Sequence, residues 1–213
     1  MTIDKDSIKA SAELLEVVID TFVTPDGLAK DLPVVGTIFS LAEACNSFRN
    51  KRFAKRVTTF LNNFNSEEFE KFKKMIAKKS NEDLGEEILS VIENLEKEEQ
   101  VHMVARATKN HINLIEGGNS SESVKYIFDH NIHIIKRLDS HALTGLHAIY
   151  GESNSTRINS VDHFLFSLGL LEMNIIDMAP VGGVSLPYHQ YSPCEEGKDF
   201  SWKIIRTNES SAN

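Results

Sequence analysis

The chain has 213 residues, of which 41% are hydrophobic and 25% are charged, and its formal net charge is -8. This composition is typical of a globular protein with a sizeable core, and it excludes bulk disorder and fibrous designs. The acidic charge argues against a protein whose main task is to neutralise nucleic-acid phosphates.

The two cysteines, Cys45 and Cys194, lie far apart in the sequence, which argues against a disulfide framework and favours a reducing cytoplasm. Residues 1–20 carry acidic side chains within their apolar stretch, so we expect no secretory signal there. The longest apolar stretch, residues 32–45, is interrupted by a proline, a glycine and a glutamate, and it is shorter than the ~20 residues that cross a bilayer. We therefore predict a cytoplasmic protein.

Apolar residues recur at helical spacing along the first two thirds of the chain. A first helix is predicted over residues 6–22, and the sequence TPDG at 24–27 ends it because proline and glycine favour a turn. Asp31 and Pro33 suit the start of a second helix, which carries one apolar face. The members of that face are Val34, Ile38, Leu41, Cys45 and Phe48, and the stripe resumes in Phe53, Val57, Phe60 and Phe64.

Four more helices are predicted before the last third of the chain, over about 66–79, 84–95, 98–116 and 121–138. Ser66 is the expected N-cap of the first of them, and Ser120 or Ser121 starts the last. Gly117 and Gly118 end the third, because glycine favours the backbone conformation that closes a helix.

The last third of the chain has a different pattern. Short helices are predicted at 140–150 and 160–170, followed by a strand at 171–178 and its partner strand at 201–207. Three helices followed by a hairpin is the order of a winged helix, with residues 179–200 as an unusually long wing.

Together these patterns predict an all-α protein made of two parts and a tail. A multi-helix bundle of about six or seven antiparallel helices covers residues 1–138, because the loops between the helices are short. A winged-helix-like module that carries a small β-hairpin covers residues 139–207. Residues 208–213 are predicted to be a disordered tail.

A candidate binding surface follows from the second predicted helix and its continuation. Its basic residues lie on one helical face, directly after the apolar stripe, and such a combination can dock on a partner protein or an anionic membrane. The candidate surface consists of Val34, Ile38, Leu41, Arg49, Arg52 and Arg56. The alternative is that the stripe belongs to the core and the arginines form a solvated face.

Histidines give two further hypotheses. His130 and His133 are three residues apart, but no third ligand follows at a recognised spacing, so neither a metal site nor a cofactor is predicted. Arg106 and His111 have the spacing R-x4-H, which resembles the short motif of the HEPN ribonucleases. That resemblance implies that Arg106 would stabilise a phosphate and that His111 would transfer a proton at the 2′-hydroxyl.

The winged-helix order also raises a DNA-binding hypothesis. The recognition helix would be residues 158–170, which contain Asp162 and His163 but no lysine or arginine. A protein that reads DNA needs a basic face to hold phosphates. Because residues 121–213 hold seven basic against eleven acidic side chains, protein contact is the favoured use of this module.

A further signal lies in residues 31–64. Its features are Pro33-Val34-Val35-Gly36, the aliphatic stripe after them, a break near Arg49-Asn50, and then Phe53, Lys55 and the pair Phe60-Leu61. This stretch resembles the start of the Abi-alpha family of small helical bacterial proteins, and the helices at 67–115 and the segment 164–172 fit the same layout. Members of the family are associated with abortive infection, so the resemblance implies a role in phage defence rather than a reaction.

We therefore expect a non-enzymatic phage-defence protein that binds a protein partner, a second copy of itself or a membrane surface through the candidate surface. The first alternative is a HEPN-like ribonuclease toxin that uses Arg106 and His111. The second alternative is a DNA-binding regulator, against which the acidic charge argues.

Overall fold

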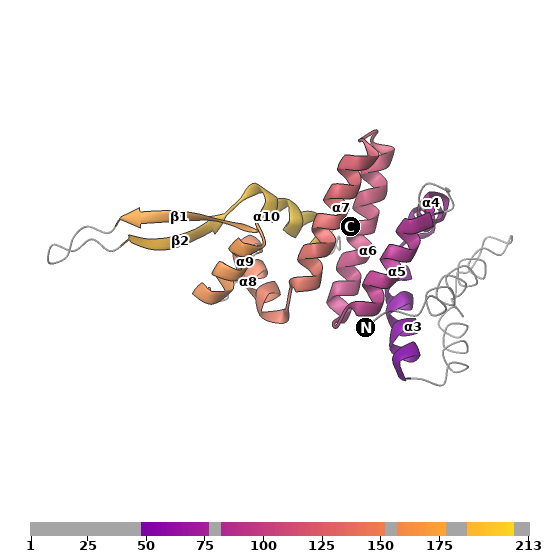
Figure 1. Ribbon diagram of the computed structural model, residues 1–213, viewed down its shortest axis with the longest axis horizontal. Coiled ribbons are helices and arrows are strands. Elements are labelled where there is room, and N and C mark those ends of the chain that lie inside the picture. Colours follow the sequence, from indigo (N-terminus) through magenta and orange to yellow (C-terminus); the bar gives the residue numbers. More distant parts are fainter. Residues whose placement is uncertain (1–47, 77–81, 152–156, 178–186, 207–213) are drawn as a thin grey trace, which may run out of the picture. The chain divides into compact units, whose positions relative to one another are not determined.

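The computed structural model describes residues 48–76, 82–151, 157–177 and 187–206 (Figure 1). These residues are mostly helical, as predicted, and a two-stranded antiparallel sheet lies near the carboxyl end. The predicted helix at 6–22, the apolar stripe before Phe48 and the tail at 208–213 lie outside the described residues.

The chain divides into two compact units, Met1–Ile132 and His133–Asn213. The division falls inside helix α7, whereas the sequence places the boundary after residue 138. The helices described in unit 1 are α3 (Phe48–Leu61), α4 (Ser66–Ile76), α5 (Glu82–Asn94), α6 (Glu98–Glu116) and most of α7 (Ser121–Arg137). Unit 2 contains α8 (Ser140–Tyr150), α9 (Asn159–Ser167), β1 (Leu171–Asp177), β2 (Pro187–Pro193), α10 (Glu195–Phe200) and the π-helix η2 (Ser201–Ile205).

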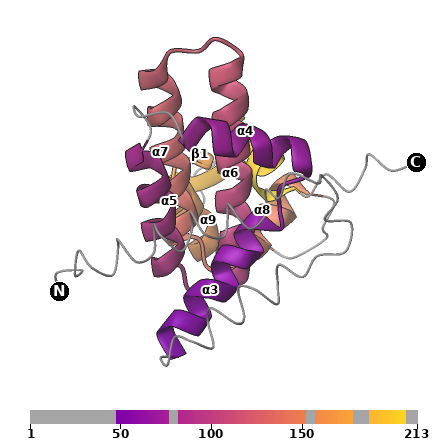
Figure 2. The same ribbon diagram turned by 90° about the vertical axis from the view of Figure 1, so that its right-hand side faces the viewer.

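Unit 1 is a helical bundle in which α6 is central. Helices α3 and α4 pack against α5 and α6, and α6 and α7 run antiparallel to each other (Figures 1 and 2). An aromatic cluster joins the end of α3 to α4, because the ring centroids of Phe60, Phe64 and Phe72 lie 5.1 to 5.7 Å apart. Such ring pairs add stability beyond the apolar area that they bury.

Local capping explains where several helices of unit 1 begin and end. Helix α4 starts at Ser66, but the N-cap is Asn65 rather than the predicted Ser66. The Asn65 Oδ1 atom accepts the N–H of Glu68 at 2.9 Å, and a carboxylate oxygen of Glu68 accepts the N–H of Asn65 at 2.9 Å. This reciprocal pair is a capping box. Asn65 and Ser66 are both small polar residues that favour the N-cap position, so the sequence alone did not distinguish between them.

The turn between α6 and α7 follows the sequence prediction. Helix α6 ends at Glu116, and Gly118 has a φ of 81°, a left-handed conformation that glycine adopts at little cost. The Ser120 hydroxyl accepts the N–H of Ser123 at 3.3 Å and so caps α7, which begins at Ser121.

Strand β1 confirms the predicted strand at 171–178, but its predicted partner is wrong. The partner is β2, in a register that runs from Leu171 opposite Pro193 to Asp177 opposite Pro187. In a two-stranded sheet both strands are edges, where proline is tolerated because part of the backbone needs no partner. Part of the predicted wing is therefore strand, and the residues after it form α10.

Residues 201–205 form η2 rather than the predicted strand. Ile204 and Ile205 are both buried, with 1% and 6% of their surface exposed. Neighbouring residues of a strand point to opposite faces, so a strand on the surface would bury only one of them. In the sequence, a short apolar run is compatible with a strand or with a helical turn. The helical turn that continues α10 places both isoleucine side chains in the core.

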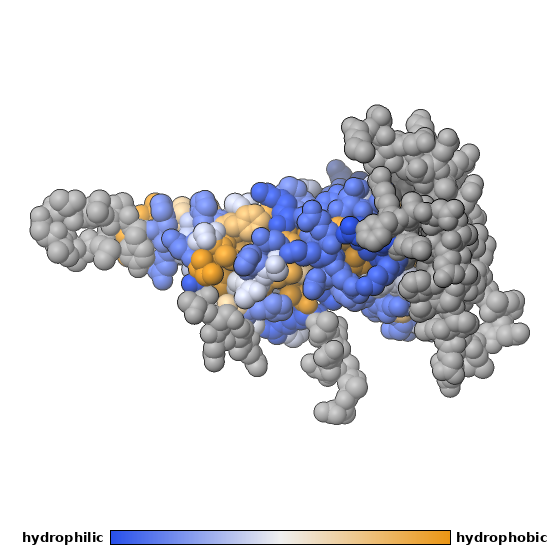
Figure 3. All heavy atoms as spheres, turned by 90° about the horizontal axis from the view of Figure 1, so that it is seen from below, coloured by the Kyte–Doolittle hydropathy of each residue, from blue (hydrophilic) through white to orange (hydrophobic). Residues whose placement is uncertain are grey.

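Polar residues cover most of the described surface on the face shown in Figure 3, and hydrophobic residues gather there in small patches. Among the described residues, the large hydrophobic side chains that remain exposed are Tyr126, Ile127, Ile158, Ile175 and Trp202. None of the helices in the described ranges is long and apolar enough to cross a membrane.

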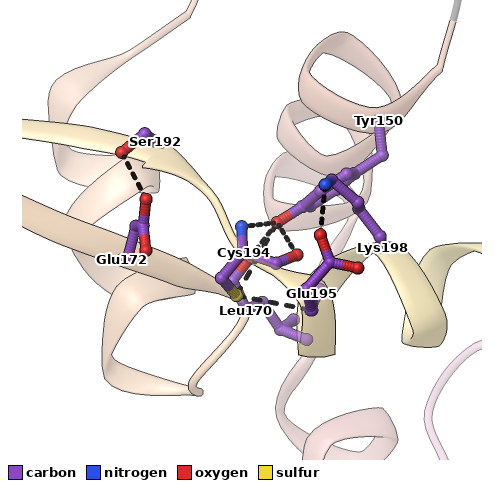
Figure 4. A network of polar contacts seen from close by, with 8 residues as sticks. Tyr150, Leu170, Glu172, Ser192, Cys194, Glu195 and Lys198 are labelled. Carbon is purple, nitrogen blue, oxygen red and sulfur yellow. Dashed lines mark hydrogen bonds and ion pairs between the residues drawn. The ribbon is translucent and has the colours of Figure 1, made fainter.

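A buried hydroxyl organises the start of α10 in unit 2. The Tyr150 side chain reaches from α8 to this point, where its hydroxyl donates to the carbonyl of Leu170 and accepts the N–H of Cys194 at 3.1 Å (Figure 4). The Cys194 Sγ atom accepts the N–H of Gly197 at 3.4 Å and caps α10. Burial raises the pKa of Tyr150 to about 12, so the hydroxyl stays protonated at neutral pH.

This arrangement predicts that Gly197→Ala destabilises the protein. A Cβ at Gly197 would press against the Tyr150 hydroxyl and the carbonyl oxygen of Leu170, so the backbone of α10 would have to shift. We expect a loss of about 1–3 kcal/mol in the free energy of unfolding, measured by urea titration. Glu196→Ala, at an exposed position of the same helix, is the matched control and should change it by less than about 0.5 kcal/mol. Equal stability of the two variants would contradict this packing.

Candidate functional site

The predicted binding surface is described only in its second half. Val34, Ile38 and Leu41 lie outside the described residues, and for Arg49 the structure describes only the helical backbone of α3. Arg52 and Arg56 are described in full, and they lie one helical turn apart on α3.

Arg52 and Arg56 line a cleft between α3 and the segment that joins α5 to α6. The cleft has a volume of about 330 Å³. Its lining residues are Arg52, Phe53 and Arg56 from α3, and Glu93, Asn94, Leu95 and Glu96 from the end of α5 and the residues after it. This volume is at the lower end of the range for ligand pockets, and it is large enough for one or two side chains of a partner.

Arg56 has a structural task in this cleft. Its Nη1 atom donates to the carbonyl of Glu93 at 2.8 Å and more weakly to that of Ile92 at 3.5 Å. The last carbonyls of a helix have no donors within the helix, so Arg56 caps the carboxyl end of α5. Burial, and then the neighbouring Arg52, lowers the pKa of Arg56, which Glu96 partly offsets.

Arg52 is exposed, unlike Arg56. No ion pair or hydrogen bond joins its guanidinium to another residue in the part of the chain that the structure describes. The half-buried ring of Phe53 follows it in the lining of the cleft. Arg52 therefore supplies a solvent-facing cation beside an aromatic ring. Arg56 forms part of the cleft wall and is held in place by its bonds to α5.

Arg106 and His111 do not share a face of α6. Five residues at 100° each place them about 140° apart around the helix axis. Burial lowers the pKa of Arg106 to about 10, so it stays cationic at neutral pH. His111 is 7% exposed, and its ring packs edge-on against Phe128 with centroids 5.2 Å apart. His111 is thus buried against α7.

His102, which the sequence analysis did not single out, contacts the turn that follows α3. The Nδ1 atom of His102 lies 3.0 Å from the Oδ1 atom of Asn63, in the turn after α3. The Asn63 Nδ2 atom donates to the carbonyl of Thr59 at 2.6 Å, which identifies the atom facing His102 as an acceptor. The proton of neutral His102 is therefore on Nδ1, and Nε2 is the basic nitrogen.

A polar stripe at helical spacing could have indicated this contact in the sequence. Lys55, Thr59 and Asn63 recur every four residues along α3 and the turn after it, as Glu98 and His102 do on α6. Lys55 pairs with Glu98 at 3.0 Å and lowers the pKa of that carboxyl, so the two stripes face each other. No nucleophile lies beside His102 among these contacts, and their evident effect is to join α3 to α6.

His130 and His133 are both exposed on α7, and no group of three or more potential ligands occurs among the described residues. His130 stacks on Tyr126 with the ring centroids 6.4 Å apart, and His133 lies 3.5 Å from an Arg137 nitrogen. Within the described ranges these histidines serve as surface residues.

The predicted recognition helix, α9, is fixed to the hairpin by its polar side chains. Arg157 pairs with the buried carboxylate of Asp162 at 2.9 Å and donates to the carbonyl of Tyr191 at 2.9 Å. The His163 Nδ1 atom lies 2.8 Å from the Tyr191 hydroxyl. Arg157, Asp162 and His163 are thus engaged in contacts within unit 2.

No protein-family model, curated protein or solved structure matches this chain. The resemblance of residues 31–64 to the Abi-alpha family therefore stays a prediction from those residues. The roles of Arg52 and Arg56 follow from the geometry of the cleft alone.

The capping contact predicts different effects for the two arginines. Arg56→Ala removes both hydrogen bonds to the end of α5, and we expect the free energy of unfolding to fall by about 1–2 kcal/mol. Arg52→Ala, one turn earlier and exposed, should change it by less than about 0.5 kcal/mol. Urea titration followed by circular dichroism measures both, and equal losses would contradict the capping role of Arg56.

Proposed function

We propose that this chain is a non-enzymatic binding protein of bacterial phage defence, and that the cleft between α3 and residues 93–96 receives a protein partner. The observation that carries the proposal is the exposed guanidinium of Arg52 beside Phe53, over a wall fixed by Arg56. The defence role rests on the resemblance of residues 31–64 to the Abi-alpha family.

The chemistry of the cleft favours a protein partner with an acidic side chain. Arginine and aromatic residues are enriched at the energetic centres of protein interfaces. The guanidinium of Arg52 can donate two hydrogen bonds to one carboxylate of the partner. The ring of Phe53 can pack against the aliphatic part of the same partner residue. Because Arg56 is already engaged with α5, the receiving surface is formed before the partner arrives, which lowers the entropic cost of binding.

The histidines of the described residues support a binding role rather than catalysis. His102 is engaged with Asn63, His163 with Tyr191, and His111 is packed against Phe128. In each case the contact joins two parts of the fold, as expected of a structural residue.

For unit 2 we propose a winged-helix-like module used for protein contact. The end of α7, then α8, α9 and the β1–β2 hairpin, follow one another in the winged-helix order. The exposed positions of α9 include Ser160, His163 and Ser167, and the helix holds no lysine or arginine. A neutral outer face suits a protein surface better than a phosphate backbone.

The proposed function predicts a phage-resistance phenotype that depends on Arg52. Expression of the chain should lower phage plaquing by orders of magnitude for some members of a phage panel, and Arg52→Glu should restore plaquing because it repels the acidic partner. Lys136→Glu, an equal charge reversal at an exposed position of α7, should keep the resistance. The two variants must accumulate to equal soluble levels.

Each failure of this experiment has its own meaning. Unchanged plaquing for the wild-type chain on every phage would reject the defence role. Resistance that persists in Arg52→Glu would reject the cleft while leaving the defence role in place. Co-sedimentation of the purified chain with anionic phospholipid vesicles, abolished by Arg52→Glu, would replace the protein partner with a membrane surface.

A further inference from the structure

His111 occupies an unusual position between α6 and α7. The residue is 7% exposed, and its Nδ1 atom is fully buried with no hydrogen-bond partner among the described residues. Its ring edge contacts Phe128 of α7, which is 1% exposed. A buried polar atom without a partner costs stability, and here it belongs to a group that can gain a proton near neutral pH.

The charged groups that act on His111, Lys125 and Asp129, come from α7, and Glu87 of α5 pairs with one of them. Lys125 and Asp129 are one turn apart on α7 and form an ion pair at 3.6 Å, and Glu87 of α5 pairs with Lys125 at 3.2 Å. Burial, and then the Lys125 cation, lowers the pKa of His111 below its ordinary value of 6.5, and Asp129 opposes this in part. His111 is therefore neutral in the folded protein at pH 7.

The amino-terminal part of α7 is held to unit 1 by buried apolar side chains and by the Lys125–Glu87 ion pair, and it follows a turn that contains glycine. Its buried apolar side chains within unit 1 are Val124, Phe128 and Ile132. The turn before it contains Gly118 at a positive φ, and both the backbone N–H and the side-chain amide of Asn119 donate to the carbonyl of Leu114. The aromatic cluster joins α3 to α4, and the ion pairs Lys55–Glu98 and Lys109–Glu68 join these two helices to α6.

We propose that the contact of α6 with α7 is an acid-sensitive joint, in which protonation of His111 releases residues 121–132 from unit 1. The protonated ring would place a charge and an unpaired Nδ1–H donor against Phe128, within the field of the Lys125 cation. Separation of α7 removes both of these groups from the ring and lets water reach it. The apolar face that opens contains Val124, Phe128 and Ile132.

The sign of the pH dependence follows from the direction of the shift. The released state binds a proton with the ordinary pKa of 6.5, and the closed state binds it only at lower pH. The joint is therefore fully closed well above pH 6.5. It weakens as the pH falls through 6.5 toward the lower pKa of the closed state, and weakens no further below that pKa.

Hydrogen–deuterium exchange of the full chain between pH 7.5 and 5.5 tests the proposal, with rates corrected for the intrinsic effect of pH. The protection of residues 121–132 should fall by up to about tenfold over this range. The protection of α3 and α4 should stay constant. Loss of protection in all helices of unit 1 together would overturn the proposal, because it would show global acid unfolding instead of release of α7.

Two variants isolate the titrating group. His111→Leu fills the same space without a titratable nitrogen and should make the protection of residues 121–132 independent of pH. His102→Gln, which removes another histidine of α6, should keep the wild-type pH dependence. A pH dependence that persists in His111→Leu would overturn the proposal. If this variant does not fold, the pKa of His111 measured by NMR in the wild-type chain decides, and a value of 6.5 or above would reject the joint.

Discussion

The cleft exists because Arg56 fastens α3 to the carboxyl end of α5. A helix leaves its last carbonyl groups without donors, and the guanidinium of Arg56 supplies N–H groups to those of Ile92 and Glu93. Arginine suits this position because it presents several donors in one plane and keeps its charge when partly buried. The same contact fixes the face of α3 on which Arg52 lies, so the proposed binding surface depends on a structural residue at its base.

Helix α6 also organises unit 1, because it contacts neighbouring parts of the bundle through its two histidines. His102 and His111 are nine residues apart, which places them on opposite sides of the helix. His102 faces α3 and is satisfied by Asn63, whereas His111 faces α7 and has a buried nitrogen without a partner among the described residues. One side of the helix is thus a stable polar contact and the other is sensitive to protonation. The bundle therefore combines the helices that form the cleft with α7, which we propose is released by acid.

Unit 2 is organised by a few polar contacts rather than by long amphipathic helices. The Tyr150 hydroxyl joins α8 to the start of α10, and the Arg157–Asp162 pair and His163 hold α9 against Tyr191 of the hairpin. These contacts use the polar side chains of α9 inside the unit.

Helix existence and several helix ends were decided by local sequence, since apolar spacing, capping residues and Gly117-Gly118 act within a few residues. The strand at 171–177 was also predicted from local sequence. Only the tertiary structure decided that β2 pairs with this strand, that Ile204 and Ile205 belong to a helical turn, and that Arg56 reaches the end of α5. These outcomes depend on contacts between segments far apart in the sequence. A short apolar run or a basic residue on a helix is compatible with several local structures, and the partner it meets selects one of them.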